Sequence, residues 1–167
     1  DLMAELQLPI LVVARGALGT VNHTLLTLEA IERRGLSLAG VVISHGNLRA
    51  MSRAFLACVE SVAPGDALLH PAPLSHGSGL YILPHVAAGA VNVVPESGGF
   101  DPEETCELIG AWDRACFFAA PTMVKRLGDH PVDADTTGLK TIVYGGGPMY
   151  VADCKAALRR FGFKLAQ

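Results

Sequence analysis

Short apolar runs rich in β-branched residues alternate with helical segments along the whole chain. The runs 8–13 and 38–43 are apolar on both faces, which is typical of buried strands in a parallel sheet. The segment between them has apolar residues at helical spacing and ends at Gly35. The same alternation continues with expected strands at 67–70, 90–94, 116–119, 141–144 and 163–165. It predicts an α/β fold in one compact domain, with a largely parallel β-sheet flanked by helices.

Composition and charge exclude several classes of function. Half of the residues are hydrophobic and only 17% are charged, so the chain can form a packed core. The net charge is −3 and no block of Lys or Arg occurs, so we do not expect nucleic acid as a partner. No apolar run approaches the roughly 18 residues that a membrane-spanning helix needs. Four separate cysteines without a C-x-x-C pattern indicate reduced thiols in the cytoplasm, with neither disulfides nor a metal site.

The loop after the expected strand 141–144 contains Gly145, Gly146, Gly147 and Pro148. Three glycines let the backbone approach a flat or anionic ligand closely, and the helix that follows offers free N–H groups. The Lys and Ser/Thr of a phosphate-binding loop do not follow, however. A nucleotide contact and a simple tight turn are equally compatible with this pattern.

The loop 73–79 superficially suggests a serine nucleophile but does not match a serine hydrolase. The G-x-S-x-G pattern of hydrolases has a glycine two residues before and two residues after the nucleophile, and His76 stands in place of the first glycine. His70, His76 and His85 do not share one helical face, so we predict pocket-lining or structural histidines and no metal site.

A third loop leads from the first expected strand into its helix. Leu18, Gly19, Thr20, Val21 and Asn22 surround the start of that helix, where free N–H groups and the positive end of the helix dipole suit a carboxylate or another anion. Many such loops bind nothing, so the alternative of an empty loop stays open.

From Gly40 onward the chain resembles the AMP-forming adenylating superfamily, specifically the fatty-acid–CoA ligases. The resemblance rests on four stretches in family order: Gly40–Leu48, Pro73–Gly79, Phe118–Met123 and Tyr144–Met149. It implies that Gly145, Gly146, Gly147 and Pro148 line an adenine pocket, and that His76, Gly77 and Gly79 border an acyl tunnel. It also implies ATP or AMP, CoA and Mg²⁺ as ligands and a role in fatty acid metabolism, although we expect none of these ligands to bind tightly.

Parts of the family pattern are not found in this chain. The Lys-containing phosphate loop should end at Gly40, where the chain reads Glu32–Ala39, and the family's Thr-Glu motif belongs after Gln167. The start at Asp1 and the end at Gln167 are therefore expected to be cuts through something longer. Because adenylation depends on cationic stabilisation of phosphate charge, we expect a ligase fragment without catalytic residues that is inactive by itself.

The first 43 residues resemble a different enzyme, dethiobiotin synthetase. The matching stretches are Leu8–Val13, Leu18–Thr27 and Gly35–Val42. The resemblance implies that Leu18–Asn22 bind a substrate carboxylate across a dimer interface, although the family's phosphate loop and catalytic lysines are not among these residues.

The two resemblances overlap at Gly40–Val42, so a chimera with a seam between Gly40 and Ser44 is expected. Residues 1–43 would then be a dethiobiotin-synthetase-like strand–helix–strand segment. Residues 44–167 would be part of an adenylating domain, with both in one continuous folded unit. Two alternatives remain: a non-catalytic module that self-associates through unpaired sheet edges, and residual carboxylate binding at Leu18–Asn22.

Overall fold

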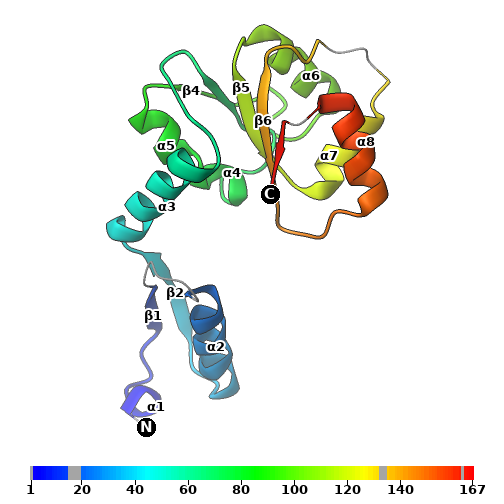
Figure 1. The fold of residues 1–167 in the computed structure, drawn as a ribbon. Coiled ribbons are helices and arrows are strands. Elements are labelled where there is room, and N and C mark those ends of the chain that lie inside the picture. The colour runs from blue at the N-terminus through cyan, green and yellow to red at the C-terminus, as the bar shows by residue number, and fades with distance from the viewer. Residues whose placement is uncertain (1, 15–19, 132–134, 163) are drawn as a thin grey trace. The chain divides into compact units, whose positions relative to one another are not determined.

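The structure is a computed structural model that describes residues 2–14, 20–131, 135–162 and 164–167 (Figure 1). For residues 20–22 it describes the backbone but not the side chains. None of the helices in these ranges has both the length and the apolar content needed to cross a membrane.

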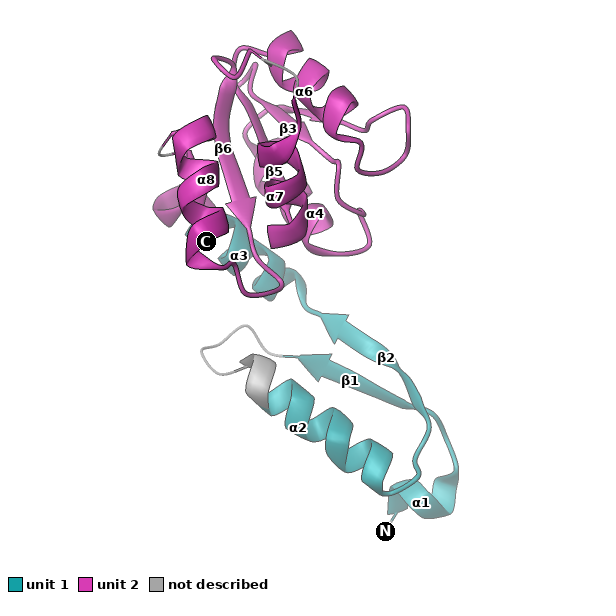
Figure 2. Cartoon of the chain, turned by 90° about the vertical axis from the view of Figure 1, so that its right-hand side faces the viewer, with its two compact units in different colours: residues 1–54 teal, residues 55–167 magenta. Residues whose placement is uncertain are grey.

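The chain divides into two compact units, residues 1–54 and residues 55–167 (Figure 2). Each unit has its own parallel sheet, whereas the sequence predicted a single sheet in one compact domain. In the second sheet β3 (Ala67–Leu69) is hydrogen-bonded to one strand on each side, whereas the strands that precede it in the sequence pair with each other. The α/β class and the parallel pairing are confirmed.

The first unit consists of one β-α-β element with a short helix before it. It contains α1 (Leu2–Leu6), β1 (Ile10–Ala14), α2 (Thr20–Arg33), β2 (Leu38–Ile43) and most of α3 (His45–Cys58). β1 and β2 pair in parallel, with Leu11 opposite Gly40 and Val13 opposite Val42. Asn47 joins α3 to this sheet, since its Nδ2 donates to the carbonyl oxygen of Ala14 at 2.9 Å.

The second unit has a five-stranded parallel sheet in the order β4-β3-β5-β6-β7. The further strands are β4 (Val91–Val93), β5 (Ala115–Ala119), β6 (Leu139–Tyr144) and β7 (Leu165–Ala166). The helices are α4 (Gly77–Leu80), α5 (Ile82–Ala87), α6 (Pro102–Ala111), α7 (Pro121–Asp129) and α8 (Val151–Phe161). Two of these helices, α4 and α5, are short and follow each other closely.

The ends of the helices follow from local chemistry. Asp101 caps α6, because its side chain accepts a hydrogen bond from the Glu104 N–H at 2.9 Å, and Pro102 follows it. α8 ends at Gly162, whose φ of 67° lies in the left-handed region that glycine adopts without strain.

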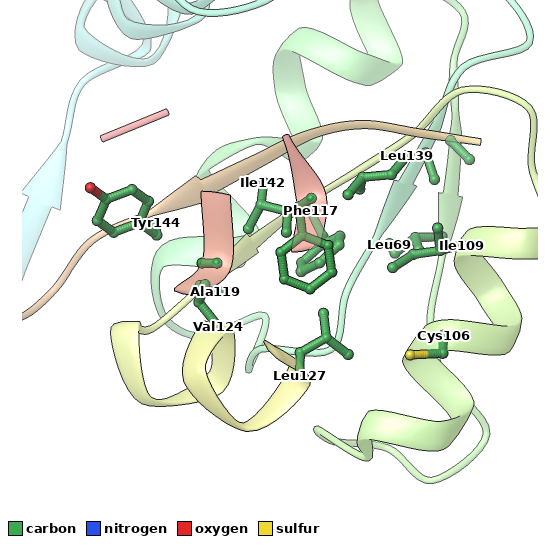
Figure 3. Close-up of a cluster of buried hydrophobic side chains, with 14 residues drawn as sticks. Leu69, Cys106, Ile109, Phe117, Ala119, Val124, Leu127, Leu139, Ile142 and Tyr144 are labelled. Carbon is green, nitrogen blue, oxygen red and sulfur yellow. The ribbon is translucent and has the colours of Figure 1, made fainter. Parts of the chain in front are cut away.

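Alternating side chains of β5 face opposite sides of this sheet. Phe117 packs with Ile109 of α6, Leu127 of α7 and Ile142 of β6 in the main core, and Figure 3 shows these side chains together. Each such fully buried side chain contributes about 1.5–3 kcal/mol to folding. Cys116 and Phe118 point the other way, toward α5 and α4. The sheet is therefore covered on both faces, and its loops gather at the carboxyl ends of the strands.

Candidate nucleotide and acyl site

The structure brings two of the three predicted loops together at the side chain of Phe118. A Cβ atom built on Gly77 would lie only 2.5 Å from Cε1 of this ring, and one built on Gly145 would lie 3.7 Å from Cε2. The backbones of the loop 73–79 and of the loop 145–148 therefore both lie against the ring. These loops follow β3 and β6, so their meeting point is at the carboxyl ends of the strands, where open α/β sheets bind ligands.

The loop 73–79 is shaped by its glycines. A Cβ on Gly79 would lie less than 3.0 Å from the carbonyl oxygen of Leu74, so a larger residue does not fit without a backbone shift. His76 is exposed, and its Nδ1 is 3.1 Å from the hydroxyl of Ser75. This side chain is thus available at the surface of the loop, beside Gly77.

The loop 145–148 leaves its backbone open. Gly146 has a φ of 81°, which favours glycine, and nothing lies within 4 Å of a Cβ built on it. Gly147 and Pro148 are exposed. The Tyr150 side chain makes no cap hydrogen bond at the start of α8, so the first N–H groups of this helix are not satisfied by it.

His70 directly follows β3 and links α4 with β4 beneath the loop 73–79. Its Nδ1 is 2.7 Å from the hydroxyl of Ser78 in α4, and its Nε2 is 2.9 Å from Oδ1 of Asn92 in β4. His70 and Ser78 are buried, and burial lowers the pKa of the His70 imidazole. The sequence predicted a pocket-lining or structural role for this histidine, but no pattern of spacing pointed to Ser78 or Asn92 as its partners.

His85 and Cys116 form a second buried pair. The Nδ1–H of His85 donates to the carbonyl oxygen of Tyr81 at 2.7 Å, which leaves Nε2 to accept from the Cys116 thiol 2.9 Å away. Burial lowers the pKa of His85 and raises the pKa of Cys116 to about 12. Both groups are therefore neutral near pH 7, and the pair is not an activated nucleophile.

A cluster of ion pairs lies at the opposite, amino ends of the same strands. Buried Asp66, before β3, pairs with Arg114 and with Lys140, whose Nζ is 2.7 Å from Oδ2. Burial raises the pKa of the Asp66 carboxyl, but hydrogen bonds from Arg114 and Lys140 outweigh this effect and hold the pKa below its usual value. Lys140 also pairs with Glu60 at 3.2 Å. These cations are at the amino ends of the strands and do not reach the loops around Phe118.

Within the described ranges no three His, Cys, Asp or Glu side chains gather where they could hold a metal ion. The family resemblance implies Mg²⁺, which prefers carboxylate oxygens. The described residues do not form a cluster of this kind and so do not fit the ion.

The third predicted loop belongs to the first unit. Leu18 and Gly19 lie outside the described residues. Thr20, Val21 and Asn22 form the first turn of α2. The predicted anion site at Leu18–Asn22 stays a prediction.

Solved structures of other proteins share the fold of this chain. Among solved structures, the amide bond synthetase McbA from Marinactinospora thermotolerans is 27% identical, with a TM-score of 0.64 over 75% of this chain and 28% of that one. ATP-bound MatB from Rhodopseudomonas palustris is 23% identical, with a TM-score of 0.61 over 73% of this chain and 24% of that one, and shows the shared fold.

The sequence model of the family described as AMP-binding enzyme matches residues 38–167. Because this match covers most of the chain, the protein belongs to the AMP-binding enzyme family. The predicted resemblance to adenylate-forming ligases is confirmed.

A short segment is similar to a different enzyme. The ATP-dependent dethiobiotin synthetase BioD of Anaeromyxobacter sp. (strain K) is 68% identical over 45 residues, which are 27% of this chain and 20% of that protein. The enzyme of the same name from Paramagnetospirillum magneticum (strain ATCC 700264 / AMB-1) is 59% identical over 44 residues. The predicted resemblance to dethiobiotin synthetase is thus confirmed. The chain spans about a fifth of the length of these curated relatives and about a quarter of the structural neighbours.

Proposed function

We propose that residues 38–167 form the adenine-binding and acyl-binding walls of an AMP-forming fatty-acid–CoA ligase. Adenine would lie on Gly145, Gly146, Gly147 and Pro148, and the acyl chain beside His76, Gly77 and Gly79. The observation that carries this proposal is the packing of Gly77 and Gly145 against the same ring, that of Phe118. In such a ligase the acyl carboxylate must meet the α-phosphate of the nucleotide, so the two walls have to be neighbours.

The proposed reaction class has two steps. A carboxylate oxygen attacks the α-phosphorus of ATP and pyrophosphate leaves, and then the CoA thiolate attacks the acyl carbon and AMP leaves. The first step places negative charge on phosphate oxygens, and enzymes stabilise such charge with positioned cations and N–H groups. Lys140 and Arg114 lie at the far ends of the strands and are bound to carboxylates. We therefore infer that the 167-residue chain binds adenine nucleotide and acyl chain weakly but does not catalyse adenylation by itself.

Calorimetry with AMP at millimolar concentration tests the adenine wall. The unmodified chain should release heat, and Gly146→Val should abolish the signal because a β-branched side chain is strained at a φ of 81°. Gly98→Val is the matched control, because Gly98 also has a positive φ of 69° and open space around it. If Gly146→Val and Gly98→Val bind AMP equally well, the loop assignment is wrong.

Exchange of labelled pyrophosphate into ATP, dependent on a fatty acid, tests the inferred lack of catalysis. We expect no exchange above the rate without protein. A signal that depends on the acid would overturn this inference. It would not bear on the adenine wall, which the calorimetry tests separately.

We also infer that the chain joins segments of two ancestries within β2, with a seam between Gly40 and Ser44. The match to the AMP-binding family begins at residue 38, inside this strand. Sequencing the source DNA across the codons for residues 35–47 tests the seam, and a different coding sequence there would refute it.

The proposed ligase ancestry implies a cytoplasmic protein, because activation consumes ATP and free thiols such as Cys58 stay reduced there.

A second candidate function is self-association through the first unit. Leu11, Val13 and Ile43 of β1 and β2 are each at least half exposed, and a two-stranded sheet has unpaired backbone groups at its edges. A second copy of this chain could cover both. Light scattering at increasing concentration tests this candidate, and a monomer throughout would remove it.

A further inference from the structure

The neutral imidazole of His70 carries a proton on one ring nitrogen, and its two hydrogen-bond partners determine which one. Asn92 presents its carbonyl oxygen Oδ1 to Nε2, so the ring proton is on Nε2. Nδ1 then carries a lone pair and accepts from the Ser78 hydroxyl at 2.7 Å. The backbone N–H of His70 also donates to the carbonyl oxygen of Val93 at 2.9 Å, so the residue is fixed to β4 by its backbone and by its side chain.

Ser78 is the residue through which this arrangement reaches the proposed acyl wall. It stands between Gly77, which contacts the Phe118 ring, and Gly79, which lies against the Leu74 carbonyl. It is completely buried in α4, and the residue that precedes this helix, His76, makes no side-chain cap hydrogen bond. A four-residue helix has little stability of its own, so its position depends on contacts such as the one to His70.

We propose that His70 is a positioning residue, which sets the place of Gly77–Gly79 against Phe118 through its hydrogen bond from Ser78. His70 does not face the ligand in this role, because it is buried beneath the loop. The inference rests on the proposed acyl site, since it assigns to that site the residue that fixes the shape of its wall.

Ser78→Ala is the primary test, because it removes the hydroxyl but keeps the backbone. In the ligand-free chain, the amide NMR signals of Gly77 and Gly79 should shift. The affinity for decanoate should fall about threefold to tenfold, the range expected for one lost hydrogen bond, while the affinity for AMP stays unchanged. Ser61→Ala is the control, since this exposed serine precedes the sheet and lies in neither proposed site. Unmoved glycine signals would overturn the proposal, and so would equal losses of decanoate and AMP affinity, which indicate general destabilisation.

Two substitutions of His70 separate positioning from packing. An asparagine places its amide near the position of Nδ1 and can still accept from Ser78, whereas a glutamine places its amide near that of Nε2. His70→Asn should therefore retain more decanoate affinity than His70→Gln, and the reverse order would contradict the proposal.

The same binding measurements distinguish a failure of the proposed acyl site from a failure of the positioning role of His70. If the unmodified chain binds no decanoate, the acyl site is refuted, and the positioning of an acyl wall is refuted with it. If decanoate binds and Ser78→Ala changes nothing, only the positioning role fails.

Discussion

At the scale of single residues, the buried His85–Cys116 pair shows that a thiol beside an imidazole is not sufficient for reactivity. Cys116 is 3% exposed, and burial raises its pKa to about 12, so almost no thiolate exists at neutral pH. Cys58 is exposed. A maleimide should therefore modify Cys58 within minutes at pH 7 and leave Cys116 unmodified in the folded chain. Peptide mass spectrometry measures both, and fast labelling of Cys116 in folded protein would contradict the neutral pair.

Asp66 makes stability depend on pH in a defined direction. Its pKa is held below the usual 3.8, so its contribution is present above that pH and is lost as the pH falls through the lowered value. Asp66→Asn should destabilise the chain at pH 7 by about 1–3 kcal/mol, between the values for exposed and buried pairs, because Arg114 is half exposed.

Urea unfolding at pH 7 and near pH 3 measures this effect. The difference between Asp66→Asn and the unmodified chain should shrink at the lower pH, because Asp66 is then protonated in the unfolded chain, which lowers the free energy of unfolding only where the native carboxylate is present. A difference that is the same at both pH values would show that the loss comes from packing and not from charge.

At the scale of elements, the sequence predicted the parallel strands and the two loops that meet at Phe118. Alternating apolar runs determine strands, and glycines such as Gly146 mark the turns that need them. The hydrogen bond between His70 and Asn92 could not be predicted in this way. It depends on β3 and β4 being neighbours, and strand order follows from packing rather than from local spacing. The same is true of Asp66, Arg114 and Lys140, which are far apart in the sequence and meet only because three strands begin side by side.

Two glycines within helices should respond to the same substitution with opposite signs. Gly79→Ala places a Cβ against the Leu74 carbonyl oxygen and should destabilise the chain by about 1–3 kcal/mol. Gly128→Ala in α7 meets nothing within 4 Å and should stabilise it by about 0.5–1 kcal/mol, since alanine loses less entropy in a helix. Thermal unfolding of both variants measures the effects, and a loss of stability in both would contradict the open space at Gly128.

At the scale of the whole molecule, buried apolar side chains are distributed unequally between the two units. Among residues 2–14 and 23–54, whose side chains the structure describes, Ile31 is the only buried apolar side chain. The second unit has a core that includes Phe117, Leu127 and Ile142. Burial of apolar surface is the main favourable term in folding, so the two units differ in the free energy that holds them together.

Hydrogen exchange should show this difference directly. The amides of β1, β2 and α2 should exchange through low-energy local opening, because few apolar contacts are lost when they open. The amides of β5 and β6 should exchange at least about a hundredfold more slowly, which corresponds to about 2.7 kcal/mol of additional opening free energy. Peptide-resolved exchange at constant pH measures both units in one sample.

Repeating it at a tenfold higher protein concentration adds a control, because a second copy that covers β1 and β2 would slow exchange there and leave β5 and β6 unchanged. Equal protection at every concentration would mean that the first unit is stabilised by contacts other than its own buried apolar side chains.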